Sequence, residues 1–240
     1  MANKFHKTKG IILKSIKFKE NSKILNILTK DYGLVPFIAK GANNKKNKFF
    51  GKTEVFSLVE IVFTLKETRQ VQTITDINIE HFFYSFIQDY NKLNFAYLID
   101  DILLKTLLEY KKIEKIFYNV IDIFYKLDEL NAKYIPNLYF IFLYEYLRSN
   151  GFGLNFNNCQ KCDSKLNDNA YFDVEDTQII CNNCAKNITN KYKINGSFLI
   201  DKLIYYKLDK IMDVNFFNQN VLWIFNLAFQ NHFNYNLKEL

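Results

Sequence analysis

The sequence predicts an α+β protein of several domains: an N-terminal five-stranded β-barrel of the oligonucleotide-binding (OB) type, an α-helical body and an inserted four-cysteine zinc knuckle. Three observations support this prediction. Strand patterns fill residues 8–75, helical spacing of apolar residues begins near residue 80, and all four cysteines lie in one short segment. We therefore expect domains at 1–78 (barrel), 79–155 (helices), 156–190 (zinc insertion) and 191–240 (helices that pack on the helical domain).

The strand region divides into short apolar segments separated by polar turns. Gly33 supplies the positive φ of a tight turn, and Pro36 indicates an edge position or irregular pairing. No helical stretch between the strands is long enough for a βαβ crossover, so a small closed barrel is favoured, and the OB barrel is the five-stranded form. The expected strands are 10–19, 22–29, 34–40, 55–65 and 71–75.

The remaining elements are helices by the spacing of their apolar residues. Pro136 fits the first turn of a helix, and Asn150-Gly151 is a typical helix end. The aromatic residues along these helices indicate a packed core. The expected helices are 93–107, 112–130, 136–149, 197–212 and 217–233.

Two C-x-x-C pairs carry all the cysteines of the chain, and their spacing is typical of a four-thiolate zinc site. Zinc bound by four thiolates has no open position for water or substrate, so one structural zinc ion is expected and metal catalysis is not. The predicted ligands are Cys159, Cys162, Cys181 and Cys184.

Other uses of the cysteines are less consistent with the pattern. Free or disulfide-bonded cysteines would not require two C-x-x-C pairs, and a redox motif needs only one pair. A zinc deaminase would carry an H-x-E motif and P-C-x-x-C, but His6, His81 and His232 stand in no H-x-E, and no proline precedes either pair.

Composition predicts a folded protein that does not span a membrane. Hydrophobic residues make up 49% of the 240 residues and aromatic residues 17%, which is enough for a core. No apolar run approaches the length of a membrane span, and the polar, basic start of the chain shows no signal peptide. Reduced thiols fit a cytoplasmic location.

Positive charge is concentrated in the first 70 residues, which hold 15 Lys or Arg and 5 Asp or Glu, whereas the rest hold 17 and 20. This asymmetry indicates a nucleic-acid-binding barrel, although a solvated charged face would look similar. Phe49 and Phe50, beside the basic loop, could stack on bases or could be loop residues that fold back on the barrel. The candidate DNA-binding residues are Lys14, Lys17, Lys19, Lys23, Lys40, Lys45, Lys46, Lys48 and Lys52.

Several segments, in order, resemble the RecO family of bacterial recombination mediators. The N-terminal segments are Gly10-Ile11-Ile12-Leu13, Thr29-Lys30-Asp31-Tyr32-Gly33, Ala39-Lys40-Gly41-Ala42 and Phe56-Ser57-Leu58-Val59-Glu60. The later ones are Leu147-Arg148-Ser149-Asn150-Gly151-Phe152-Gly153-Leu154, which leads into the first cysteine pair, and Phe229-Gln230-Asn231-His232-Phe233.

The resemblance implies an OB barrel, a helical domain and a zinc site. It also implies binding of single- and double-stranded DNA, annealing of complementary strands, and loading of the RecA recombinase. The implied partners are RecR and the C-terminal tail of the single-stranded-DNA-binding protein (SSB), in a nucleoid-associated, non-enzymatic role. Relatives often carry Arg after Ala-Lys-Gly-Ala, whereas this chain has Asn43-Asn44 and places lysines further along the loop.

Two other functions stay open on the sequence alone. An RNA-binding or transcription-associated protein with an OB barrel and a zinc ribbon would carry similar charge. A nuclease would need clustered carboxylates for two metal ions. The adjacent acidic pairs are Asp100-Asp101, Asp128-Glu129 and Glu175-Asp176, and the first two are expected on exposed helix faces.

Overall fold

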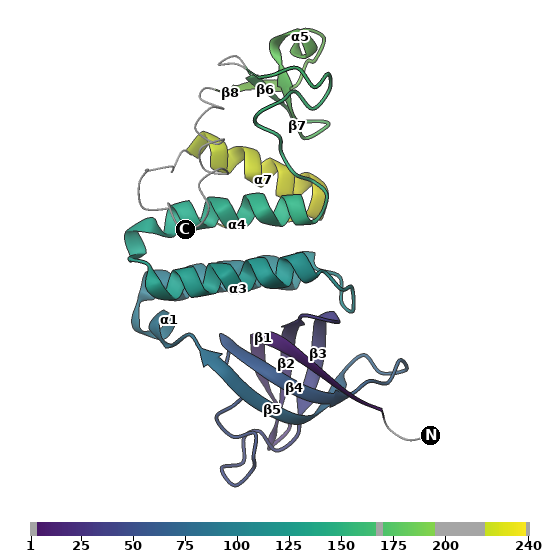
Figure 1. The fold of residues 1–240 in the computed structure, drawn as a ribbon, viewed down its shortest axis with the longest axis vertical. Coiled ribbons are helices and arrows are strands. Elements are labelled where there is room, and N and C mark those ends of the chain that lie inside the picture. The colour runs from purple at the N-terminus through teal and green to yellow at the C-terminus, as the bar shows by residue number, and fades with distance from the viewer. Residues whose placement is uncertain (1–3, 167–169, 195–218, 239–240) are drawn as a thin grey trace. The chain divides into compact units, whose positions relative to one another are not determined.

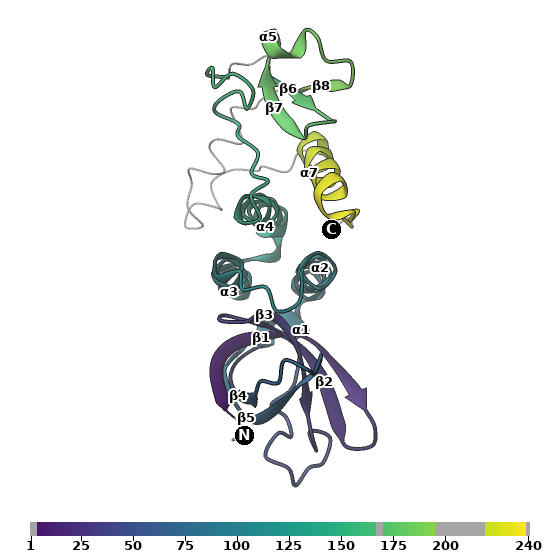
Figure 2. The ribbon, with the colours of Figure 1, turned by 90° about the vertical axis from the view of Figure 1, so that its right-hand side faces the viewer.

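The computed structural model describes residues 4–166, 170–194 and 219–238. The chain divides into two compact units, Met1–Asp128 and Glu129–Leu240, and the ribbon in Figures 1 and 2 follows their elements. The division into four domains stays a prediction, and the predicted helix 197–212 lies outside the described residues. None of the described helices combines the length and apolarity that a membrane crossing requires.

The first unit begins with five strands in the order β1-β2-β3-β5-β4, closed by pairing of β1 with β4. All neighbours are antiparallel except β3 and β5. This confirms the predicted five-stranded barrel. The strands are β1 Phe5–Phe18, β2 Ser22–Thr29, β3 Gly33–Ala39, β4 Ser57–Thr64 and β5 Gln72–Phe82.

Strand β5 extends seven residues beyond the segment 71–75 predicted from the sequence. Its second half alternates polar residues with Ile77 and Ile79, but Asp, Asn and Glu at the polar positions lower its β-propensity. Pairing with β4 along nearly the whole length holds it extended. Strand β3 pairs with β5 at only two residues, and Pro36 comes before both of them. The missing N–H of Pro36 therefore interrupts no hydrogen bond between β3 and β5.

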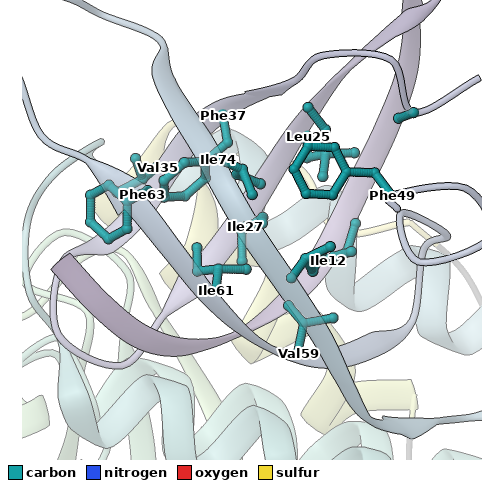
Figure 3. Packing of buried hydrophobic residues seen from close by; sticks show 13 residues of the cluster. Ile12, Leu25, Ile27, Val35, Phe37, Phe49, Val59, Ile61, Phe63 and Ile74 are labelled. Carbon is teal, nitrogen blue, oxygen red and sulfur yellow. The ribbon is translucent and has the colours of Figure 1, made fainter. Parts of the chain in front are cut away.

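The barrel interior is filled by aliphatic and aromatic side chains from all five strands (Figure 3). Phe37 and Phe63 pack edge to face with ring centroids 5.0 Å apart. The cluster consists of Ile12, Leu25, Ile27, Val35, Phe37, Ala39, Ala42, Phe49, Val59, Ile61, Phe63, Ile74 and Ile77.

Three helices complete the first unit: α1 Tyr84–Gln88, α2 Tyr90–Thr106 and α3 Glu114–Glu129. The Asp89 carboxylate caps α2 by accepting bonds from the Asn91 and Lys92 amides. Phe83 stacks on Phe86, and both rings meet Phe124 of α3 edge to face. This aromatic cluster joins the end of β5 to α1 and α3.

The second unit contains two long helices, α4 Ile135–Ser149 and α7 Gln219–Phe233, with the short η1 helix Ala132–Tyr134 before α4. Pro136 lies in the first turn of α4 and Gly151 follows its end with φ +88°, as predicted. Tyr146 of α4 stacks on Phe229 of α7, with centroids 5.6 Å apart.

A small three-stranded sheet between these helices in sequence carries the cysteine segment. Its strands are β6 Ala170–Asp173, β7 Gln178–Cys181 and β8 Lys191–Ile194, in the order β7-β6-β8, and the one-turn helix α5 Asn182–Ala185 follows β7. The Asn231 side chain of α7 donates hydrogen bonds to the Val174 carbonyl and the Thr177 hydroxyl in the β6–β7 turn. The sheet is thereby tied to α7.

Candidate metal centre and nucleic-acid interface

The four cysteine sulfurs converge on one point, as the sequence predicts. All four Sγ atoms lie within 4.8 Å of one another, and those of Cys162 and Cys181 are 3.8 Å apart. Four sulfurs placed tetrahedrally at about 2.3 Å from a zinc ion would be about 3.8 Å apart. The cluster therefore has the dimensions of a four-thiolate metal site.

Local backbone structure positions each pair of cysteines. In the first pair, the Cys159 amide donates to the Ser164 carbonyl and the Asp163 amide donates to the Cys159 carbonyl, both at 2.8 Å. Asp163 takes φ +57° to complete this knuckle. In the second pair, Cys181 ends β7 and Cys184 lies one turn later in α5. A strand end followed by a helical turn places both sulfurs on the same side.

The thiols are free, and hydrogen bonds already favour thiolates at two of them. The Cys184 backbone N–H lowers the pKa of Cys181 to about 6, and the Ser164 hydroxyl lowers the pKa of Cys162. The hydrogen bond with Cys162 raises the pKa of Cys184 to about 12. Four close sulfurs cannot all ionise without a cation to offset their repulsion, which is what a bound metal ion supplies.

Two polar residues of the first knuckle support the cluster, and the sequence interpretation missed both. Gln160 Oε1 accepts hydrogen bonds from the Asn155 and Ile179 amides, which joins the knuckle to β7. Lys161 Nζ lies 2.8 Å from carboxylate oxygens of both Asp173 and Asp176. The sequence signal for Gln160 and Lys161 is their place between the two cysteines of a C-x-x-C pair. That place does not identify the residues with which they interact.

The nine predicted DNA-binding lysines all lie on the barrel or on the loop 40–56. In Figures 1 and 2 this loop projects from the barrel on the side away from α2 and α3. Asn43 holds the loop to the β1–β2 turn, donating from its backbone to the Asn21 carbonyl and from its side chain to the Ser22 carbonyl. The turn, the end of β3 and the loop thus form one continuous basic region.

The structure separates these lysines into two groups. Lys23 forms an ion pair with Glu54 and Lys48 one with Asp76, while Lys52 Nζ donates to the Ile77 carbonyl. These three hold the loop to the barrel. The other six are exposed and form no ion pair with any residue that the structure describes; they are Lys14, Lys17, Lys19, Lys40, Lys45 and Lys46.

The structure decides between the two alternatives for Phe49 and shows that the expectation for Asp100 is wrong. Phe49 is only 5% exposed and belongs to the barrel core, because the turns of residues 41–52 fold its ring inward beside Leu25 (Figure 3). Phe50, its neighbour, is 47% exposed. Asp100 was expected on an exposed helix face, but it is 2% exposed in α2 and both of its oxygens lack a hydrogen-bond partner among the described residues.

No carboxylate cluster for two metal ions is found in residues 4–166, 170–194 and 219–238, where the cysteines form the one group placed to hold a metal ion. The Asp128 carboxylate instead interacts with His81 and Ser85. Asp176 pairs with Lys161.

Comparison with known proteins gives two family matches that together span most of the chain. Residues 1–83 match the N-terminal domain of recombination protein O, and residues 87–226 match its C-terminal domain. The DNA repair protein RecO of Clostridium novyi is 29% identical over 200 residues, which cover 83% of this chain and 76% of the relative. RecO of Mesoplasma florum is 30% identical over 183 residues, covering 74% and 66%.

Proposed function

Because this chain belongs to the recombination protein O family of DNA repair proteins, we propose that it binds single- and double-stranded DNA and anneals complementary strands. The observation that supports this proposal is the group of six exposed lysines on the barrel and its loop that have no ion-pair partner among the residues that the structure describes. They lie within the segment that matches the N-terminal family domain.

The lysines act on phosphates and do not read sequence. Each ammonium that neutralises a phosphate releases condensed counterions, so affinity falls steeply as salt rises. Lysine supplies a point charge with flexible reach and no bidentate geometry. Such contacts hold a backbone and leave the base edges available, which is what pairing with a second strand requires.

We propose that the four cysteines hold one structural zinc ion. The spacing of their sulfurs matches four thiolates around one ion, and four protein ligands leave no position for a reacting water. Acidic residues near the knuckle, including Asp163 and Glu175, make it a poor contact for DNA. The metal site therefore serves to stabilise the fold, and the protein is not an enzyme in this proposal.

The family also leads us to propose partners. The mediator would act with RecR and with the C-terminal tail of SSB, and would help load RecA onto SSB-coated single strands. It would work at the nucleoid in the cytoplasm.

Annealing of complementary DNA strands coated with the cognate SSB, with and without this protein, tests the proposal. Faster annealing is the expected result. If naked strands are bound but SSB-coated strands do not anneal faster, the mediator role is overturned. Tighter binding to single-stranded RNA than to DNA would then favour the RNA-binding function.

A further inference from the structure

A cavity of about 150 Å³ lies in the second unit beside the cysteine knuckle, apart from the lysines of the proposed DNA-binding surface. Three parts of the unit line it: the loop that follows α4, the knuckle together with the β6–β7 turn, and the end of α7. We call this space the His232 cavity. Its lining includes Phe152, Gln160, Asp176, Thr177, Gln178 and His232.

Hydrogen bonds between distant segments fix the walls of the His232 cavity. The Gln160 side chain donates to the Gly153 carbonyl at 3.3 Å and accepts from the Ile179 amide at 2.9 Å. The Thr177 hydroxyl accepts from the Asn231 side chain of α7 at 2.9 Å. The walls are therefore in place before a ligand arrives, which reduces the entropic cost of binding.

One wall of the cavity is aromatic. Phe152 and His232 stack with ring centroids 4.0 Å apart and an interplanar angle of 7°. Phe152 is 37% exposed, so part of its ring is open to a ligand. Burial lowers the pKa of His232, and its imidazole is therefore uncharged at neutral pH. This wall offers two flat rings and no positive charge.

The β6–β7 turn gives the edge of the cavity a net negative charge. Lys161 pairs with both Asp173 and Asp176 at 2.8 Å, and one ammonium offsets only one of the two carboxylates. The Asp176 side chain is 56% exposed and lines the cavity. Glu175 precedes it, is exposed, and has no ion-pair partner among the described residues. The edge of the cavity therefore attracts a cation.

We propose that the His232 cavity is a docking site for an arginine side chain of a second protein. A guanidinium is planar and weakly hydrated, so it packs on aromatic rings, and its fork of N–H donors matches a carboxylate such as Asp176. An ammonium lacks the flat shape, and a nucleotide would bring further negative charge to an acidic edge.

The arginine is assigned to a second protein because this chain carries only two arginines of its own. Arg148 lies at the end of α4 and pairs with Glu145. Arg69 lies in the loop between β4 and β5, in the first unit.

Nuclear magnetic resonance titration of the full chain tests the proposal with three probes: a capped Gly-Arg-Gly peptide, the matching Gly-Lys-Gly peptide and thymidine monophosphate. The side-chain signals of Gln160, Gln178 and His232 report binding at the cavity. The arginine peptide should bind about tenfold more tightly than the lysine peptide. Equal affinities for the two peptides, no binding of either, or tighter binding of thymidine monophosphate at these signals would overturn the proposal.

Variants show whether the cavity itself holds the arginine. Phe152→Leu keeps an apolar side chain without a flat ring and should weaken binding of the arginine peptide about fivefold. Asp176→Asn should weaken it about threefold. Asp163→Asn is the matched control, because it removes the same charge from an exposed position of the knuckle outside the cavity lining.

The control should leave the affinity unchanged, since asparagine also tolerates the φ of +57° at position 163. Equal losses in Asp176→Asn and Asp163→Asn would mean that the peptide senses only the general charge of the knuckle. Full affinity in Phe152→Leu would exclude the ring from the site. Either result overturns the arginine site, and thermal melting shows that each variant is folded.

Discussion

Lys23 and Glu54 form an ion pair of 2.9 Å in which the lysine side chain is only 14% exposed. By charge and position in the sequence, Lys23 is indistinguishable from its neighbours in the basic region. The Glu54 carboxylate neutralises the charge of Lys23 locally and orients the lysine side chain toward the loop. Contacts of this kind divide the nine candidate lysines into two groups: those that hold the loop to the barrel, and those that have no ion-pair partner among the described residues.

We predict that the double change Lys45→Gln/Lys46→Gln weakens DNA binding and reduces the slope of log affinity against log salt by about 1.5 units. Both side chains are exposed and have no ionic partner among the described residues. Lys23→Gln is the control and should change the slope much less. Fluorescence anisotropy over a range of salt concentrations measures the affinity and the salt slope of each variant. Equal slopes in the two variants would contradict the division of the lysines into two groups.

Cys181→Ser should remove the bound metal and lower the melting temperature, with little change in DNA affinity. A structural four-thiolate zinc site contributes on the order of 10 kcal/mol to folding, and serine is a poor replacement ligand. Asn183→Ser, at an exposed position within the same C-x-x-C pair, is the control. Metal analysis and thermal melting give the readout; full zinc content with unaltered melting in Cys181→Ser would refute the ligand assignment.

Gly33→Ala should be much more destabilising than Gly51→Ala, although both glycines have positive φ, +71° and +76°. A Cβ on Gly33 would lie 2.0 Å from the Lys111 carbonyl oxygen, whereas one on Gly51 would have no neighbour within 4 Å. Gly51→Ala costs the left-handed backbone strain alone, about 1–2 kcal/mol. Gly33→Ala must also displace the segment that follows α2, for a total of about 3 kcal/mol or more.

Urea unfolding of both variants measures the difference. Similar free energies of unfolding for Gly33→Ala and Gly51→Ala would show that residues 107–112 do not press on the β2–β3 turn. The expected contact includes the hydrogen bond from the Tyr110 amide to the Leu34 carbonyl.

Asp100→Asn should remove part of the pH dependence of stability. Burial raises the pKa of Asp100 well above 3.8 in the folded protein, so the unfolded chain loses this proton first. The free energy of unfolding therefore falls as pH rises above about 3.8 and continues to fall until the folded pKa is reached. An amide cannot ionise, so the variant should gain stability relative to wild type at neutral pH.

Urea unfolding at about pH 4.5 and about pH 7.5 tests this expectation. Asp101→Asn is the control because the neighbouring carboxylate forms an ion pair with Lys105 and is not fully buried. An identical pH slope in wild type and Asp100→Asn would mean that the buried carboxyl has a partner that offsets its burial.

The elements whose signals are local could be predicted from the sequence. The cysteine cluster is one example, because each C-x-x-C pair presents two sulfurs through a short-range turn. The barrel strands and the end of α4 shortly before Gly151 are others, since alternation and a positive φ depend on neighbouring residues alone.

The roles of individual side chains could not be predicted, because they depend on contacts between distant segments. Phe49 and Phe50 are adjacent and identical, yet only Phe49 is in the core. Asp100 and Asp101 are likewise adjacent, and helical rotation buries one and exposes the other to Lys105. The register of β1, β2 and β3 gathers Ile16, Ile24 and Ile38 into one row.

The sequence by itself determined the five-stranded barrel, most of the helices and the four cysteines that come together, since local periodicity and spacing specify each of them. Only the tertiary structure decided which lysines of the barrel and its loop pair with acidic side chains and which of Phe49 and Phe50 is exposed. Charge and size do not reveal a partner such as Glu54 for Lys23, 31 residues away along the chain. Such pairs exist only once the barrel has closed.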